Sequence, residues 1–384
     1  MVRPAHLLVS GTYRSGTTFV ERLIDNLSDG FCAAQPFPYL YLSAKRRFLS
    51  EQGVRIPQYP IGTGFHDPVH LPNEMAASLG SAVFDPAVIA ETFRSMQGYS
   101  GAQTPELAEV VEHIGGGTLG EVVRSMHTLL AERHRASARV LASKEVLLEE
   151  FIPTCAEAGI RVLLVVRDPR AVVASTFGPA ANAWTGTPRP LLYTIRLWRK
   201  SVAYALKFED TVACVRLEDL AEDPARTLRD RLRTLDIETD GAVADPLLDA
   251  RGRAWAHNTS YPDSTHTGLS DRQLAYVEAL TGPEMLALGY APAYEADPDG
   301  DALERFRAVD DPGREHPAFD TDYSIDPAQL SLERARLAHL RSRESLPDEA
   351  SWFVLPDVRD RLAATAERES SMMPIIPYRR GPLA

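Results

Sequence analysis

The sequence contains few lysines, few cysteines and no long apolar run, and each scarcity excludes a class of protein. Of its 384 residues, 41 are basic and 53 acidic, so the formal net charge is −12, and only four of the basic residues are lysines. A protein that neutralises nucleic-acid phosphates needs a basic domain or a dense Lys/Arg tract. The sequence contains neither, so we expect no nucleic-acid partner.

The three cysteines exclude a disulfide framework and a zinc site. Cys32, Cys155 and Cys214 are odd in number, far apart and without a C-x-x-C pair. We therefore expect no metal site and a location in the reducing cytoplasm. No run approaches the roughly 18–20 apolar residues of a membrane span, and the apolar run near the N-terminus is too short for a signal peptide. We expect no integral membrane segment.

What the sequence does contain is a pattern of alternating strands and helices. With 44% hydrophobic residues the chain can bury a large core. Strands alternating with helices predict a parallel sheet covered by helices on both faces. The sequence therefore predicts an α/β fold of three layers. The predicted strands are residues 6–10, 139–143, 161–166 and 211–217. The predicted helices are 17–27, 104–135 with an interruption at the glycines of 115–117, 146–158, 190–209 and 223–235.

Two other regions carry a different composition. Residues 31–80 are rich in Pro, Gly and aromatics, which predicts long loops and short helices. We expect the loop-rich region at about 31–100 to shape an acceptor site. After residue 294 the chain becomes acidic and Pro-rich. We predict an α/β domain over 1–294 and, over 295–384, a C-terminal extension with short helices that packs on the domain or mediates a homodimer.

The segment GTYRSGTT lies between the first strand and the first helix and has the chemistry of a phosphate-binding loop. Gly11 and Gly16 permit a tight turn, and Thr17 and Thr18 add hydroxyl donors at the start of a helix. The spacing resembles the P-loop pattern G-x-x-x-x-G-K-[ST], but Thr17 replaces the lysine and the loop's cation is Arg14. A nucleoside triphosphatase is therefore disfavoured.

At these residues the sequence resembles the sulfotransferases that use 3′-phosphoadenosine 5′-phosphosulfate (PAPS). Their loop [KR]-[SA]-G-[TS]-[TS], which binds the 5′-phosphosulfate, is matched by residues 14–18, including Ser15. A second motif of the family is a strand ending in Arg, with a Ser eight residues later, which together hold the 3′-phosphate. Arg167 and Ser175 match it at that spacing.

The resemblance extends to about residue 290 and implies a P-loop-like fold, PAPS as co-substrate and PAP as product, without a metal. WAHNTSYPDSTHTGLS resembles the terminal segment of bacterial members, where a basic loop closes over the nucleotide. Arg251, Gly252 and Arg253 are the matching candidates for a second contact with the 3′-phosphate.

In-line sulfonate transfer needs a held donor, a deprotonated acceptor hydroxyl and stabilisation of the leaving phosphate oxygen. Arg14 is the candidate for stabilisation, because a guanidinium keeps its proton at neutral pH. The family's base positions are occupied by Val146 and Gln35, which cannot act as bases. His66, His70 and Glu145 are therefore the candidate bases, since His titrates near neutrality.

The partner of Lys144 and the activity itself are left open by the sequence. Lys144 either reaches the sulfonate, as the family's Lys does, or pairs with Glu145 or Glu149. The leading hypothesis is transfer to the hydroxyl of a small molecule such as a secondary metabolite or a lipid. The alternatives are an atypical P-loop kinase or nucleotide hydrolase, and an inactive nucleotide-binding relative.

Overall fold

We describe a computed structural model of the whole chain. Contacts divide the chain into two compact units: the first holds Met1–Arg167 and Lys200–Ser264, and the second holds Asp168–Arg199 and Thr265–Ala384. The predicted boundary after residue 294 stays a prediction. The structure describes residues 4–36, 38–53, 72–95, 105–177, 188–243, 268–292, 303, 305–311, 313, 327–342, 358, 361 and 362.

A five-stranded parallel sheet forms the centre of the first unit, which confirms the predicted α/β fold. Its order is β2-β5-β1-β6-β7, so β1 lies in the middle. β1 and β6 are nearly all buried, as expected of parallel strands covered on both faces. The strands are β1 (Ala5–Gly11), β2 (Gly30–Ala34), β5 (Val140–Lys144), β6 (Ile160–Val166) and β7 (Val212–Arg216).

The predicted loops after residue 30 are wrong at one point, because β2 lies there and forms an edge of the sheet. Its residues GFCAA are all buried and pair in register with β5, from Gly30 opposite Val140 to Ala34 opposite Lys144. A five-residue strand that ends in two alanines has no clear alternation and weak β-propensity. Pairing with β5, rather than local sequence, therefore explains the strand.

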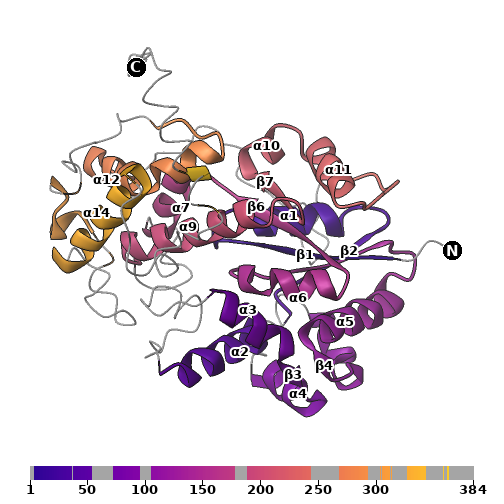
Figure 1. Cartoon of the computed structure of the whole chain (residues 1–384). Coiled ribbons are helices and arrows are strands. Elements are labelled where there is room, and N and C mark those ends of the chain that lie inside the picture. The colour runs from indigo at the N-terminus through magenta and orange to yellow at the C-terminus, as the bar shows by residue number, and fades with distance from the viewer. Residues whose placement is uncertain are drawn as a thin grey trace. The chain divides into compact units, whose positions relative to one another are not determined.

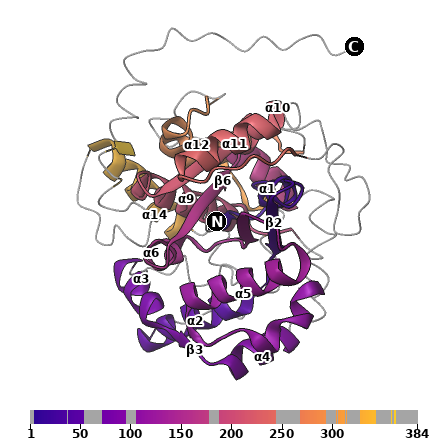
Figure 2. The ribbon, with the colours of Figure 1, turned by 90° about the vertical axis from the view of Figure 1, so that its right-hand side faces the viewer.

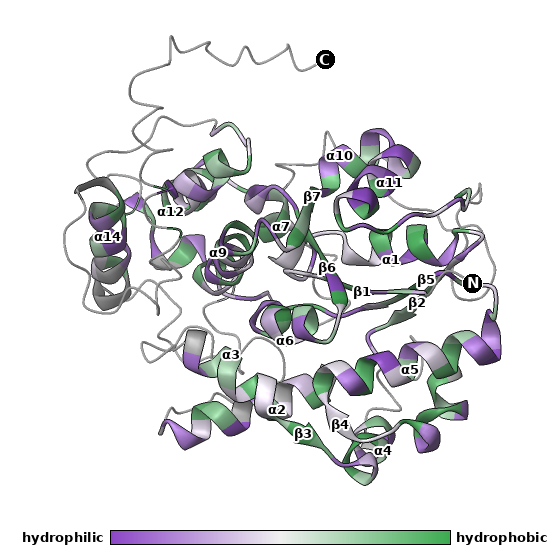
Figure 3. Cartoon of the chain, turned by 45° about the vertical axis from the view of Figure 1, so that its right-hand side comes forward, coloured by the Kyte–Doolittle hydropathy of each residue, from purple (hydrophilic) through white to green (hydrophobic). Residues whose placement is uncertain are grey.

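Helices cover both faces of this sheet (Figures 1 and 2). On one face α1 (Thr17–Asp25) and α11 (Pro224–Thr234) pack in one hydrophobic cluster with β1, β6 and β7, and α10 (Leu217–Glu222) adds Leu217 and Leu220. On the other face α5 (Leu119–His134) and α6 (Ile152–Glu157) pack in a second cluster. Figure 3 shows that α5 and α11 alternate between hydrophilic and hydrophobic sides, as amphipathic helices do.

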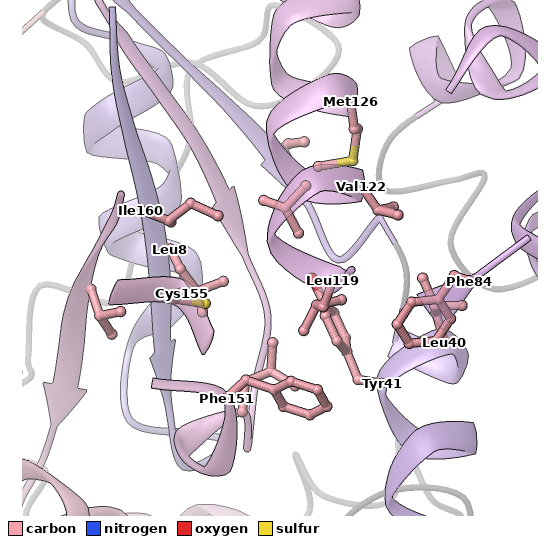
Figure 4. Packing of buried hydrophobic residues seen from close by; sticks show 14 of the residues in the cluster. Leu8, Leu40, Tyr41, Phe84, Leu119, Val122, Met126, Phe151, Cys155 and Ile160 are labelled. Atoms are coloured by element: carbon pink, nitrogen blue, oxygen red, sulfur yellow. The ribbon is translucent and has the colours of Figure 1, made fainter. Parts of the chain in front are cut away.

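The second cluster extends into the helices that follow β2. Figure 4 shows Leu40, Tyr41 and Phe84 packed with Leu119 and Phe151. The elements of this region are α2 (Pro38–Glu51), α3 (Pro72–Ser81), α4 (Pro86–Ser95), the 3₁₀-helices η1 (Pro105–Glu109) and η2 (Val111–His113), and the antiparallel pair β3 (Val83–Phe84) and β4 (Gly117–Thr118).

The helical pattern over 104–135 is interrupted at the glycines of 115–117, as the sequence predicts. The part before the glycines forms the 3₁₀-helices η1 and η2, and α5 begins after Thr118, whose side chain forms a capping box with Glu121. A second predicted helix begins later than the periodicity indicates. The helix predicted over 146–158 is a 3₁₀-turn η3 (Glu149–Phe151) followed by α6. Leu147 explains the delay, because its φ of 61° is incompatible with a right-handed helix.

The second unit is built from helices taken from two distant parts of the chain. α7 (Pro169–Phe177) and the first half of α9 (Leu191–Lys207) pack with α12 (Asp271–Ala287) through a cluster that includes Val173, Ile195 and Leu280. Tyr276 of α12 stacks on Phe306 with ring centroids 3.8 Å apart. α14 (Pro327–Ser342) adds Leu337 to the cluster. A short 3₁₀-helix, η4 (Ala308–Asp310), lies between them in sequence.

Candidate functional site

The loop between β1 and α1 has a backbone that only glycine permits at its two ends. Gly11 has φ 145°, and a Cβ there would lie 2.2 Å from the Val165 carbonyl oxygen of β6. Gly16 has φ 97°, and its Cβ would lie 2.5 Å from Leu217 Cδ1. Arg14 also lies in the left-handed region, with φ 67°. The loop therefore packs closely against the Val165 backbone at one end and the Leu217 side chain at the other, where a side chain on either glycine would clash.

The same loop presents the start of a helix, where an anion is favoured. Gly16 is the N-cap of α1, and no side chain from the described residues caps the helix. The first amides of a helix lack an intrahelical acceptor and carry the positive end of the helix dipole. Thr18 is exposed here, whereas Thr17 and Ser15 are buried. The arrangement can bind a phosphate or sulfate group.

Hydrogen bonds within the loop fix its turn. The Ser15 amide donates to the Thr12 carbonyl oxygen at 3.1 Å. The Ser15 hydroxyl donates to the same oxygen at 2.5 Å. Ser15 therefore contributes to the shape of the loop, and the exposed Arg14 side chain extends from that turn.

Arg167 lies next to this loop. It directly follows β6, which pairs with β1 so that Gly11 is opposite Val165. Arg167 Nη1 donates to the Arg14 carbonyl oxygen at 3.2 Å. Carboxyl ends of parallel strands are where α/β proteins bind ligands. The structure thus brings together two of the predicted cationic residues, Arg14 and Arg167, at one edge of the sheet.

The other half of the predicted 3′-phosphate motif lies in the second unit. Ser175 is on α7, and its hydroxyl donates to the Val172 carbonyl oxygen at 2.9 Å. Asp168, the neighbour of Arg167, accepts a hydrogen bond from Arg170 Nη2 at 2.6 Å. Arg170 Nη1 donates a second hydrogen bond to Glu278 Oε1 at 2.6 Å. Burial lowers the pKa of Arg170, but both carboxylates raise it above the ordinary value. The Asp–Arg pair after β6 is therefore a buried ion pair of the second unit.

Lys144 pairs with neither of the partners predicted from the sequence. Its ammonium lies 3.5 Å from Glu21 Oε2 and 3.2 Å from Gln35 Oε1, all three side chains being buried. Burial raises the pKa of the Glu21 carboxyl, and Lys144 opposes that shift. The predicted pairing with Glu145 or Glu149 is wrong, because Glu21 of α1 faces the end of β5. Periodicity places Glu21 on a helix and gives no sign of this contact.

Glu145 follows Lys144 and is also buried, with 1% of its surface exposed. Its amide donates to the Val9 carbonyl oxygen at 2.9 Å, which places it beside β1. Burial and the negative charge of Glu145 together raise the pKa of Tyr41 well above its ordinary value. The other candidate bases, His66 and His70, lie outside the described residues. Arg251, Gly252 and Arg253 lie outside them too.

The buried polar residues that contact the loop were not predicted from the sequence. Thr12 Oγ1 donates to Ser201 Oγ at 2.9 Å, and both side chains are buried. Three of the four lysines, Lys45, Lys144 and Lys200, are buried as well. The scarcity of lysine did not identify these positions, because the fourth lysine, Lys207, is only partly buried. Their partners are not predictable from the sequence, because they lie on distant elements.

The described residues meet neither the requirements of a metal site nor those of a membrane span. In the described ranges no group of His, Cys, Asp and Glu is arranged to hold a metal ion. Among the helices that the structure describes, none is long and apolar enough to span a membrane.

The solved structures that are similar to the chain include two sulfotransferase domains. The sulfotransferase domain from the curacin biosynthetic pathway is 17% identical, with a TM-score of 0.35, over 62% of this chain and 76% of that one. The sulfotransferase domain of the Synechococcus PCC 7002 olefin synthase is 15% identical, with a TM-score of 0.34, over 96% of each chain. No model of a protein family and no curated protein matches the sequence.

Proposed function

We propose that the protein is a sulfotransferase that moves a sulfonate group from PAPS to a hydroxyl of a small molecule. The observation that carries the proposal is the loop of residues 12–16, which presents helix amides and Arg14 at the carboxyl end of β1, beside Arg167. The resemblance of residues 14–18 to the family's phosphosulfate loop supports the same ligand.

The described residues fit an anionic nucleotide. Glycine at positions 11 and 16 lets the loop pack closely against Val165 and Leu217, and the start of α1 offers amide donors. When bound, PAPS supplies an activated sulfonate on a phosphate leaving group. Arg14 stabilises the negative charge that develops on the leaving oxygen, and Thr17 and Thr18 join the amides of the loop in binding the 5′-group. Arg167, with Ser175, is the proposed contact of the 3′-phosphate.

The acceptor hydroxyl must lose a proton as its oxygen forms the new bond to sulfur. His66, His70 and Glu145 are the proposed bases, and a base within hydrogen-bond reach of the hydroxyl takes that proton. Glu145 is the described member of this set and is buried near the end of β5. Arg251, Gly252 and Arg253 remain proposed nucleotide contacts.

Arg14→Ala tests the proposal directly. We expect the variant to fold but to lose transfer by a factor of about 100 or more, because a preorganised cation aimed at developing charge contributes that much. The measurement is transfer of labelled sulfonate from PAPS in a screen of hydroxyl acceptors. Arg14→Lys should keep part of the activity. Arg229→Ala removes the same charge from an exposed position of α11 and should change nothing. Full activity in Arg14→Ala would refute the assignment.

Nucleotide binding separates this proposal from a kinase. We expect calorimetry to show binding of adenosine 3′,5′-bisphosphate without Mg²⁺, because the loop has Thr17 where a P-loop has its lysine. Preference for Mg-ATP would favour the kinase alternative. Binding of the bisphosphate without transfer to any acceptor would favour an inactive nucleotide-binding protein.

A further inference from the structure

A chain of buried hydroxyl and carboxylate groups connects the loop to the interior of the first unit. Thr12 Oγ1 donates to Ser201 Oγ at 2.9 Å, and Ser201 Oγ donates to Glu149 Oε1. Thr12 belongs to the loop, Ser201 to α9 and Glu149 to η3. None of the three exposes more than 2% of its surface.

Glu149 is one member of a buried quartet of Lys45, Glu149, Glu150 and Lys200. Lys200 Nζ lies 2.8 Å from Glu149 Oε2 and 2.9 Å from Glu150 Oε1. Lys45 Nζ lies 2.7 Å from Glu150 Oε2. Two positive and two negative groups face one another, so their formal charges balance in the buried cluster. Burial alone lowers the pKa of Lys200, but Glu149 and Glu150 raise it above the ordinary value.

The quartet is also joined to the loop through the backbone of residues 147 and 148. Lys45 Nζ donates to the Leu147 carbonyl oxygen at 2.5 Å. The Leu147 amide in turn donates to the Gly11 carbonyl oxygen at 3.1 Å, and the Leu148 amide donates to Ser10 Oγ at 3.2 Å. The residues at the start of the loop are therefore hydrogen-bonded to the same backbone segment that Lys45 of the quartet contacts.

The charge on Glu149 determines the direction of these hydrogen bonds. A carboxylate only accepts, so Ser201 must donate its single proton to Glu149. Ser201 then offers a lone pair to Thr12, whose own proton is directed away from the anion site. The Thr12 carbonyl oxygen meanwhile accepts from both the amide and the hydroxyl of Ser15. One ordered chain thus runs from Glu149 through Ser201 and Thr12 to Ser15.

We infer that Ser201, oriented by Glu149, is a positioning residue for the phosphate loop. It holds Thr12 so that the turn at 12–15 keeps the amides at the start of α1 in an anion-binding geometry. The identity of the anion as a PAPS-type nucleotide rests on the proposed function. The positioning itself rests on the hydrogen bonds of this unit.

The test compares Ser201→Ala and Thr12→Val, each of which removes one end of the hydroxyl pair, in the full chain. Loss of one buried hydrogen bond predicts a roughly tenfold increase in the Kd for adenosine 3′,5′-bisphosphate. We expect the double variant to lose about the same tenfold, because both hydroxyls act through one bond. Thr12→Ser keeps the hydroxyl and should stay within about twofold of wild type. Ser43→Ala, which removes an exposed hydroxyl from α2, is the control.

Hydrogen exchange of the loop amides decides the inference without any ligand. We expect faster exchange at residues 11–16 in Ser201→Ala and Thr12→Val, unchanged exchange in α5, and recovery in Thr12→Ser. Loop exchange equal to wild type in both folded variants overturns the inference. So does a hundredfold loss of affinity in the double variant, because the two hydroxyls then act independently. Failure of wild type to bind the bisphosphate would refute the proposed function alone, since the exchange comparison still tests Ser201.

Discussion

Arg14 is an exposed residue whose backbone is in an unfavourable conformation. Its φ of 67° costs an L-amino acid about 1 kcal/mol relative to glycine. An exposed arginine in this conformation fits a role in binding. The place of Arg14 in the loop and of Thr17 at the start of α1 was predictable from the sequence, because the glycine spacing is local information.

The positive φ of Arg14 also leads to a prediction about the free energy of unfolding. We expect Arg14→Gly to be about 1 kcal/mol more stable than Arg14→Ala, because glycine adopts positive φ without a clash. Urea unfolding of the two variants measures the difference, and both should lack transfer activity. A more stable Arg14→Ala would show that this residue is not in the left-handed region.

A half-buried and a fully buried imidazole, His6 and His127, predict a loss of stability in acid. His6 Nδ1 lies 3.3 Å from His127 Nδ1, and the rings stack. Burial, and then Arg124, lower the pKa of His6 to about 4. Burial and His6 lower the pKa of His127 well below its ordinary value. Because the unfolded chain binds protons below pH 6.5 that the folded chain excludes, stability is present above that pH and is lost as the pH falls towards 4.

His127→Phe removes the more buried member of the pair. Between pH 7 and pH 5 we expect the variant to lose about 1–2 kcal/mol less unfolding free energy than wild type does, because one titrating group is gone. Urea unfolding at the two pH values measures this difference. His134→Phe changes an exposed histidine of the same helix and should keep the wild-type pH dependence. An unchanged dependence in His127→Phe would exclude this pair as its source.

At the scale of elements, the strands that the sequence predicts are those whose own residues specify them. β6 is a nearly continuous apolar run, and β1 leads into a loop with a recognisable pattern. β2 was missed because its register comes from β5, which lies more than a hundred residues further along the chain. Contacts such as Lys144 with Glu21 were missed for the same reason, since they depend on which strand ends are neighbours.

The close approach of Gly11 in β1 to Val165 in β6 predicts that one added methyl group destabilises the protein. In Gly11→Ala the new Cβ would meet a backbone oxygen of Val165 at 2.2 Å, and the φ of 145° is strained for alanine. We expect a loss of about 3 kcal/mol or more, because the neighbouring strand cannot move without breaking its pairing. Chemical unfolding measures it. Gly115→Ala, where nothing lies within 4 Å of the new Cβ, should stay within about 0.5 kcal/mol of wild type. Equal stability of the two variants would contradict the packing at Gly11.

At the scale of the whole molecule, each unit is built from two stretches that are separate in the sequence. The second unit joins residues 168–199 to residues 265–384. A buried ion network spans these two stretches: Arg199 Nη1 donates to Glu333 Oε2 at 2.6 Å, and Arg196 Nε donates to Glu333 Oε1 at 2.8 Å. α14 is therefore part of this unit's interior. Composition shows an acidic, Pro-rich tail and gives no sign of such a partner, because the paired residues lie 134 and 137 positions apart.

The ion network between the two stretches depends on Glu333, because both Arg196 and Arg199 donate to its carboxylate. Burial would raise the pKa of its carboxyl, but Arg199 and Arg196 hold it well below the ordinary value, so the group is ionised at neutral pH. In Glu333→Gln two buried guanidiniums lose their counter-charge, and removing one partner of a buried pair costs about 3–5 kcal/mol. Urea unfolding of the full chain measures the loss. Arg334→Gln removes a charge from an exposed position of the same helix and should cost less than about 1 kcal/mol. If Glu333→Gln were no less stable than Arg334→Gln, the network would contribute nothing to holding the two stretches together.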